Sequence, residues 1–281
     1  MPPLPQDLVE RALAFAASAE PPAEPRHAAT IALVRDGAAG PEVYLLRRTS
    51  SMAFAAGMHV FPGGSVDARD GAAGAGWSGP SPAEWAAWLG CDERLARELV
   101  CAAVRETFEE SGVLFAGGTA GTVVADTTSD DWEADRLALI DRRLSLADVL
   151  GRRGLVVRSD LLRPWARWIT PEFEPRRFDT RFFVGALPAG QRTRDVGGEA
   201  DQVTWLPPAE AVAGYRDGSL AMLPPTAVTL AELASYEEVA AALAATREVV
   251  PLMPRAVVEG TTVRLVVDGP DGERPADEVP S

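Results

Sequence analysis

The stretch RETFEESGV, residues 105–113, places three glutamates within five positions of a predicted helix. A helix advances by about 100° per residue, so with Glu106 as the origin Glu109 lies at about 300° and Glu110 at about 40°. The three carboxylates therefore share one face, and Phe108 lies on the opposite, apolar face. Like charges at this spacing repel by roughly a few tenths of a kcal/mol per pair. A chain that keeps such a turn needs something that offsets its charge.

Two explanations fit this acidic turn. It is either a solvated face of a surface helix or part of a metal site, because three converging carboxylates suit a hard divalent cation. Arg105, four residues before Glu109, relieves only part of the repulsion. The upstream stretch FPGGSVDARD, residues 61–70, predicts a strand end, a glycine turn and an acidic loop with Asp67 and Asp70. This context favours the metal site.

Together the two segments resemble a Nudix box, G-x5-E-x7-R-E-U-x-E-E-x-G-U, where U is apolar. Gly64 matches the first glycine, Asp70 takes the place of the first glutamate, and RETFEESGV matches the second half. Between Asp70 and Arg105 lie 34 residues where the motif has 7, so 27 extra residues interrupt the box. LLRRTSSMAFAAGMHVFPGG, WARWITPEFEPRRFDTRFF and LPPT extend the resemblance over residues 27–256. They resemble the branch of Nudix hydrolases with a long insertion in the box, which includes coenzyme A and acyl-CoA diphosphatases.

The resemblance implies an α/β (α+β) fold: a Nudix-like α/β/α sandwich with a mixed central sheet, a helical insertion and a C-terminal helical extension. We expect an N-terminal helix with a Pro-rich lead-in (1–26) and a Nudix hydrolase domain (27–256) with the insertion at 71–97. A terminal strand and a disordered tail (257–281) would follow.

Local patterns predict the individual elements. Apolar, β-branched-rich runs predict strands at 29–36, 42–48 and 179–187, the first two as a hairpin or as two adjacent strands. A long helix is expected over about 92–111, with Gly112 as its C′ residue. Further expected elements are helices at 6–19, 145–150 and 226–246, one helix capped by Ser81 and one opened by Pro208, a short strand at 112–116, and a terminal hairpin of AVVEG and TVRLVVDG.

The resemblance also implies the chemistry, which is hydrolysis of a diphosphate linked to a nucleoside with the help of Mg²⁺ or Mn²⁺. The expected metal ligands are Glu106, Glu109, Glu110 and the backbone carbonyl of Gly64. Arg105 would orient a carboxylate by charge-assisted hydrogen bonds. Glu199, in the loop before VTWLP, is the expected general base; the alternative is an ordinary loop acid.

The residues expected to bind substrate are Arg48, Arg176, Arg177, Trp85 and Trp88. Arginine forks suit phosphate groups, although a salt bridge to Asp179 would explain the arginine pair equally well. The tryptophans of the insertion either cover a pantetheine or acyl chain or anchor the insertion to the main domain.

The substrate stays open among three alternatives. The first is coenzyme A or an acyl-CoA, which would give 3′,5′-ADP and a 4′-phosphopantetheine derivative. Arg48, Gly57 and Phe61 fit the motif associated with coenzyme A hydrolysis, but Ala53 and Ala55 stand where arginine and histidine are expected. The second alternative is ADP-ribose, a dinucleotide or a nucleoside triphosphate, and the third is a catalytically silent nucleotide-sensing module.

Composition narrows the partners. The chain has 281 residues, 27 basic and 41 acidic, and a formal net charge of −14. Such a surface argues against nucleic acid and anionic membranes as partners and favours a small nucleotide-containing substrate. Two cysteines are too few for a disulfide framework, and the N-terminal stretch lacks a basic start. We therefore expect a cytoplasmic protein, with which a homodimer is compatible.

Overall fold

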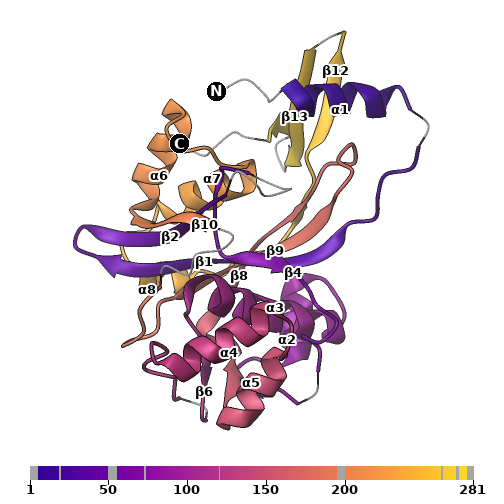
Figure 1. Ribbon diagram of the computed structural model, residues 1–281. Helices are drawn as coiled ribbons and strands as arrows, with labels where there is room; N and C mark the ends of the chain where they lie inside the picture. Colours follow the sequence, from indigo (N-terminus) through magenta and orange to yellow (C-terminus); the bar gives the residue numbers. More distant parts are fainter. Residues whose placement is uncertain are drawn as a thin grey trace.

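The computed structural model describes residues 6–18, 20–49, 56–72, 74–119, 121–194, 200–260, 262–269 and 272–276. In this part of the chain a mixed sheet lies between two layers of helices, which is the α/β/α arrangement expected from the sequence (Figure 1).

Eight strands of the described residues form the central sheet. They are β1 (Arg26–Gly37), β2 (Gly40–Arg48), β3 (His59–Val60), β4 (Gly63–Ser65), β8 (Leu162–Ile169), β9 (Phe178–Ala186), β10 (Ala200–Leu206) and β11 (Pro251–Leu252). The order is β10-β2-β1-β9-β8-β11, with β3 beside β2 and β4 beside β1. β1 and β2 form the expected antiparallel hairpin, whereas β9 runs parallel to β1, so the sheet is mixed. Ala29 pairs with Gly64, so the two glycines expected to form a turn lie instead in strand β4, against the middle strand β1.

The first helical layer holds the interrupted box. It consists of α2 (Pro82–Leu89), α3 (Glu93–Ser111), α4 (Asp130–Ile140) and α5 (Leu146–Arg153), with a small sheet of β5 (Gly76–Ser78), β7 (Val156–Arg158) and β6 (Ala116–Gly117). Ser81 caps α2 through its side chain, with Pro82 at the first helical position, as expected. Asp92 caps α3, which ends at Gly112 in the left-handed conformation with φ 74°. The predicted long helix is therefore confirmed.

The second helical layer covers the opposite face of the sheet with α6 (Pro208–Asp217), α7 (Pro224–Leu233) and α8 (Val239–Ala244) (Figure 1). The single helix expected over 226–246 is wrong, because α7 stops and α8 starts separately. The backbone N–H of Val239 donates to the Asp36 carboxylate at 3.2 Å. A residue at the end of β1 thus helps to start α8, and no local sequence pattern reveals such a contact.

The first described helix packs on strands near the end of the described chain. α1 (Gln6–Ala16) packs on a small sheet of β12 (Arg255–Glu259), β13 (Thr262–Gly269) and β14 (Gly272–Pro275). In the main domain, a short 3-10 helix, η1 (Ser159–Leu161), precedes β8. β12 and β13 form the expected hairpin. Residues 272–275 were expected in a disordered tail, but they pair with β13. Ala276, fully buried in the core beside the second helical layer, anchors this polar segment.

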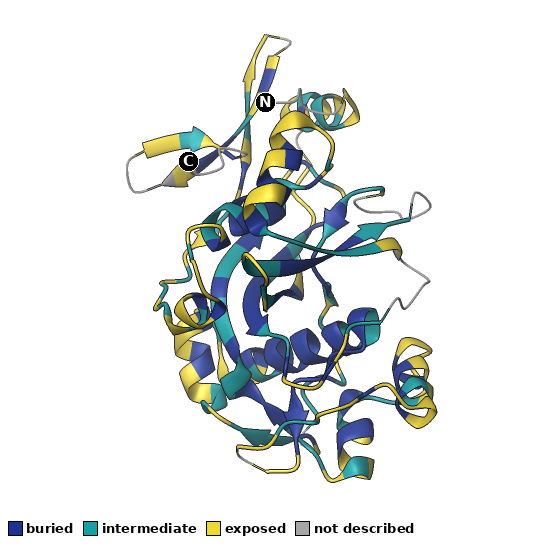
Figure 2. Ribbon diagram, turned by 90° about the vertical axis from the view of Figure 1, so that its left-hand side faces the viewer, coloured by how far each residue is buried: buried dark blue, intermediate teal, exposed yellow. Residues whose placement is uncertain are grey.

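Burial concentrates in the sheet and in α3 (Figure 2). Every residue from Leu99 to Arg105 is buried, so α3 has core contacts around its whole circumference in its middle turns. The acidic turn therefore lies at the end of a helix whose middle turns are buried in the core. No helix of the described residues has the length and apolar content needed to cross a membrane.

Candidate active site

The last turns of α3 hold the acidic residues close to the protein interior. The side chains of Glu106 and Glu109 are only 13% and 14% exposed, and the side chain of Arg105 is 10% exposed. A solvated helix face would leave them open to water. The turn is therefore a part-buried charge cluster, and its charge has to be balanced by neighbouring groups.

Arg105 is the centre of this cluster. Its Nε and Nη2 donate to the two carboxylate oxygens of Asp70 at 2.8 and 2.9 Å. Its Nη1 donates to Glu106 at 2.7 Å and to Glu109 at 3.3 Å. Its Nη2 also donates to the backbone carbonyl of Ser65 at 3.0 Å. One guanidinium thus fixes three carboxylates and the last residue of β4, as a planar fork can do and an ammonium group cannot.

Asp70 fills the place of the first glutamate of the box. It is 3% exposed and also accepts a hydrogen bond from the backbone N–H of Asp67 at 2.8 Å. Arg69 binds Asp67 in turn, at 2.9 Å between Nη2 and Oδ2. The short side chain of Asp70 therefore reaches Arg105 from a tight acidic turn, so the 27-residue interruption does not separate the two halves of the motif in space.

The glycine turn brings the backbone against the glutamates. The N–H of Gly63 donates to a carboxylate oxygen of Glu110 at 2.8 Å. A Cβ at position 64 would overlap the Glu106 carboxylate, and a Cβ at position 63 would overlap Thr30 of β1. Both glycines are needed here for close approach, because any side chain would displace a carboxylate or open the strand pairing.

Burial and repulsion shift the titration of the cluster. Burial raises the pKa of Glu106 to about 7, although the Arg105 guanidinium favours its charged form. Burial likewise raises the pKa of Glu109, again against the influence of Arg105. Burial opposes the charge of Arg105, but its hydrogen bonds to Asp70 and the charges of Glu106 and Glu109 outweigh it and raise the pKa of the guanidinium. The cluster is therefore short of positive charge.

The donor set fits a hard divalent cation. Carboxylate oxygens are the ligands that Mg²⁺ and Mn²⁺ prefer. The raised pKa values of Glu106 and Glu109 show that burial disfavours their charged forms, which a bound cation would stabilise. Across the described ranges, no three His, Cys, Asp or Glu side chains are already grouped as a metal site. One oxygen of each glutamate of the cluster contacts Arg105 or the N–H of Gly63. A cation would be held by these carboxylates.

Of the other expected site residues in the described part of the chain, Arg177 and Trp85 are buried elsewhere in the fold. Glu199, the expected base, lies outside the described residues, as do Ala53 and Ala55. Arg48 is partly buried at the end of β2 and pairs in register with Ala200, the residue after Glu199. The pairing of β10 with β2 therefore places Arg48 opposite the residue that follows the expected base in the sequence.

The arginine pair differs from the expectation of a joint phosphate site. Arg176 is exposed, whereas Arg177 is 6% exposed and donates to the carbonyls of Thr170 and Ala23 at 3.0 and 2.7 Å. Arg177 thereby ties the lead-in before β1 to the turn before β9. Asp179 is instead bound by Arg167, with two hydrogen bonds of 2.9 and 2.8 Å.

The tryptophans of the insertion divide into two kinds. Trp85 is fully buried, 5.7 Å between ring centroids from Phe183 of the central sheet. Trp88 is 43% exposed and packs edge-on against Trp85, with the ring centroids 5.1 Å apart. Trp85 therefore anchors the insertion to the domain, and Trp88 is the one of the two that a ligand can reach.

Two residues that interact with the cluster were missed in the sequence. Arg136 of α4 donates to the backbone carbonyl of Glu109 at 2.6 Å, and the backbone N–H of Arg194 donates to the carbonyl of Ser111 at 2.9 Å. Both lie outside the box and in no motif. Their role depends on the tertiary packing of α4 and of the segment before β10, so no local signal identifies them.

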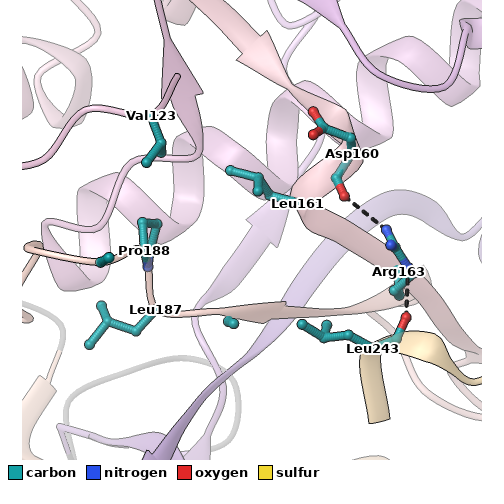
Figure 3. Close-up of a pocket in the computed structure, with 9 residues that line it drawn as sticks. Val123, Asp160, Leu161, Arg163, Leu187, Pro188 and Leu243 are labelled. Atoms are coloured by element: carbon teal, nitrogen blue, oxygen red, sulfur yellow. Dashed lines mark hydrogen bonds between the residues drawn. The ribbon is translucent and has the colours of Figure 1, made fainter. Parts of the chain in front are cut away.

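Cavities occur away from the acidic cluster. A mainly apolar cavity of about 230 Å³ lies beside the end of β9, where Arg163 donates to the carbonyls of Asp160 and Leu243 (Figure 3). A more polar cavity of about 420 Å³ lies between β10 and α6, with His59, Thr204 and Glu210 in its wall. None of the residues that line either cavity belongs to the cluster around Arg105.

Comparison with known proteins assigns the family. The model of the NUDT19 Nudix domain matches residues 83–233, which include all of α3. The chain is 25% identical to the acyl-coenzyme A diphosphatase NUDT19 of Xenopus laevis, covering 69% of this chain and 60% of that protein. It is 27% identical to the protein of the same name from Gallus gallus, covering 69% of this chain and 61% of that protein. The chain thus spans about three fifths of the length of these curated relatives.

A solved structure supports the same assignment. The NUDIX hydrolase from Alicyclobacillus acidocaldarius is 28% identical, with a TM-score of 0.64 over 80% of this chain and 98% of that chain. The fold, the acidic turn and the family model, which covers more than half of the 281 residues, agree. The chain belongs to the Nudix family, in the group described by the NUDT19 Nudix domain.

Proposed function

We propose that this chain is a metal-dependent diphosphatase that hydrolyses coenzyme A or an acyl-CoA to 3′,5′-ADP and a 4′-phosphopantetheine derivative. The observation that carries the proposal is the part-buried carboxylate cluster around Arg105, which has the donor chemistry of a divalent-cation site. The names of the frog and chicken relatives support coenzyme A chemistry.

The residues of the cluster have separate roles in this proposal. Glu106 and Glu110, four positions apart on one face of α3, are the direct ligands, and Glu109 is a third ligand or acts through water. The carbonyl of Gly64 would complete the set. When bound, Mg²⁺ or Mn²⁺ supplies charge neutralisation at the diphosphate and polarises the attacking water.

The remaining groups prepare the glutamates for this task. Arg105 holds Glu106 and Glu109 in place and is held itself by Asp70. The N–H of Gly63 orients Glu110. Because these partners fix one oxygen of each glutamate, the carboxylates lose little freedom when the other oxygens take a ligand. Glu199 is the proposed general base, and Arg48, beside the strand that follows it, is a proposed contact for substrate phosphate.

The substrate side of the proposal has a competitor. Ala53 and Ala55 replace the arginine and histidine of the motif associated with coenzyme A hydrolysis. That replacement favours keeping ADP-ribose, dinucleotides or nucleoside triphosphates as the second candidate. A catalytically silent sensing module is disfavoured, since a module without catalysis has no need for glutamates that repel one another in a part-buried turn.

A panel of substrates tests the proposal. The full chain is incubated with Mg²⁺ or Mn²⁺ and with CoA, acyl-CoA, ADP-ribose, NADH, diadenosine polyphosphates or dNTPs, and the products are identified by mass spectrometry. We expect 3′,5′-ADP from CoA or acyl-CoA at the highest rate. Faster cleavage of another member of the panel would replace the substrate, and no cleavage of any member would support the sensing module.

A further inference from the structure

The catalytic helix α3 ends in an unusual electrostatic setting. The C-terminal end of a helix carries a partial negative charge and unpaired carbonyl groups. The last turns of α3 add Glu106, Glu109 and Glu110 to this end, and the last turn contains no basic residue. Glutamates are disfavoured at this place, so the end of α3 would fray unless other elements stabilise it.

Residues from distant segments supply the missing hydrogen bonds. Nη1 of Arg136 donates to the carbonyl of Glu109 at 2.6 Å, and the N–H of Arg194 donates to the carbonyl of Ser111 at 2.9 Å. The hydroxyl of Thr127 donates to the carbonyl of Gly112 at 2.7 Å. The carbonyls of Glu109, Ser111 and Gly112, in the terminal turn and its cap, thus each receive a partner from outside the helix.

The two arginines share one carboxylate. Arg136 donates to both oxygens of Glu133 at 2.9 and 2.7 Å, and Nη1 of Arg194 donates to Glu133 at 2.6 Å. Arg136 is 3% exposed, so its guanidinium is fixed by packing as well as by hydrogen bonds. The unit of Arg136, Glu133 and Arg194 has one net positive charge, and it lies against the negative end of α3.

We propose that Arg136 is a positioning residue that, together with Arg194, keeps the terminal turn of α3 wound so that Glu109 and Glu110 stay in register for a divalent cation. This inference rests on the proposed function. Without Arg136 the carbonyl of Glu109 loses its partner in a part-buried place. Unwinding of the turn would give that carbonyl access to water, and it would also pull Glu110 away from the N–H of Gly63.

The test compares Arg136→Gln, Arg136→Lys and Arg194→Gln with wild type and with Arg153→Gln as the matched control. Arg153 of α5 also binds α4, through Asp135 at 2.6 Å and over the ring of Trp132, but within the described part of the chain it makes no hydrogen bond or ion pair with α3. Mn²⁺ binding is measured by calorimetry, the melting temperature by circular dichroism, and kcat and KM with CoA at saturating Mn²⁺.

We expect Arg136→Gln to weaken Mn²⁺ binding by about 10-fold to 100-fold and to lower kcat, with KM for CoA unchanged. Arg136→Lys, which keeps the charge and one donor, should recover part of the loss. Arg194→Gln keeps the backbone N–H that binds Ser111 but removes the side-chain hydrogen bonds to Glu133 and to the carbonyl of Thr127, so it should weaken binding in the same direction and by less. Arg153→Gln should lower the melting temperature alone. Removal of a nearby cation by itself strengthens the binding of Mn²⁺, so weaker binding identifies displaced glutamates.

Two results would overturn the inference in distinguishable ways. If wild type binds Mn²⁺ and a folded Arg136→Gln variant binds it equally well, the residues stabilise the fold only. If wild type itself binds no Mn²⁺, the proposed function fails and the inference fails with it. Should Arg136→Gln not fold, the lysine variant and Arg194→Gln, whose side chain is 19% exposed, carry the same test.

Discussion

The guanidinium of Arg105 binds the carboxylate of Asp70 through two hydrogen bonds, Nε to Oδ1 at 2.8 Å and Nη2 to Oδ2 at 2.9 Å. The two residues are 35 positions apart, on either side of the insertion. This ion pair therefore closes the interrupted motif, and it leaves Nη1 free to hold Glu106 and Glu109.

Loss of the Asp70 charge should destabilise the site. Asp70→Asn removes one member of a buried ion pair, which costs about 3 kcal/mol or more. We expect a lower midpoint in urea unfolding and a strong loss of turnover. Asp201→Asn is the control, because the Arg47–Asp201 pair is about 40% exposed on both sides and solvent screens its charges, so its loss should change stability little. Equal stability losses in the two variants would contradict the central role of the Asp70 pair.

Asp70→Glu tests the length of the side chain. It restores the residue type of the motif but inserts a methylene into a site that is 3% exposed. Overpacking of this kind costs about 1–3 kcal/mol. We therefore predict stability and turnover between those of wild type and Asp70→Asn. A variant more active than wild type would show that the short acidic turn from Asp67 to Asp70 does not compensate for the missing methylene.

The glycine at position 64 should tolerate no side chain. In Gly64→Ala the new Cβ would overlap the Glu106 carboxylate, so Glu106 must move and turnover should fall sharply. Gly151→Ala, in α5, has open space around the new Cβ and should stabilise the fold by up to about 1 kcal/mol. Kinetics and thermal unfolding of both variants check this. Normal turnover of Gly64→Ala would show that Glu106 does not need its observed position.

The raised pKa of Glu106 predicts a dependence of stability on pH without metal. Its pKa is about 7 in the folded chain, against an ordinary value of 4.5. Between these values the folded state keeps a proton that the unfolded state has lost. The contribution of Glu106 to the free energy of unfolding is therefore fully present below pH 4.5 and is lost as pH rises through 7. Glu106→Gln cannot ionise and should be more stable than wild type at pH 8, on the order of 2 kcal/mol.

Urea unfolding in the presence of a chelator, at pH 4.5 and pH 8, measures this difference. Mg²⁺ added at pH 8 should then stabilise wild type and leave Glu106→Gln nearly unchanged, since ligand binding to the folded state adds stability. If the two proteins have equal stability at pH 8 without metal, Glu106 is not forced into an unfavourable charged state.

The two tryptophans of α2 should separate stability from substrate binding. Trp85→Ala removes a fully buried ring and should cost about 3–5 kcal/mol. Trp88→Ala changes a side chain that is 43% exposed and should change stability by about 0.5 kcal/mol or less. If the insertion contacts the acyl chain, Trp88→Ala raises the KM for acyl-CoA more than the KM for CoA. Unchanged KM values for both would remove Trp88 from the substrate site.

Much of this architecture was predictable because the signals are local. The hairpin of β1 and β2 follows from two apolar runs around a Gly-containing turn, and α3 from Asp92, its apolar face and Gly112. The acidic turn and the glycine turn predicted the carboxylate cluster by residue type and spacing. In each case the physical cause acts over a few residues, so the sequence displays it.

The remaining features depend on contacts between distant segments. Asp36 assists the start of α8, Ala276 anchors β14 in the core, and Arg136 caps the end of α3. Arg177 was expected to bind substrate, but it is buried and donates to the backbone carbonyl of Ala23 in the lead-in before β1. A single sequence shows the residues of each contact, but only the packed fold shows that they meet.

The most direct measurement compares the turnover of CoA by wild type, Glu110→Gln and Glu93→Gln at saturating Mg²⁺ or Mn²⁺, with 3′,5′-ADP as the detected product. Glu93 is exposed in the first turn of the same helix, so Glu93→Gln makes the same chemical change away from the cluster. The proposal predicts that all three proteins fold, that wild type and Glu93→Gln release 3′,5′-ADP, and that Glu110→Gln loses most of its turnover. Near-normal turnover by a folded Glu110→Gln variant would contradict the assignment of the acidic turn of α3 as the hydrolytic metal site.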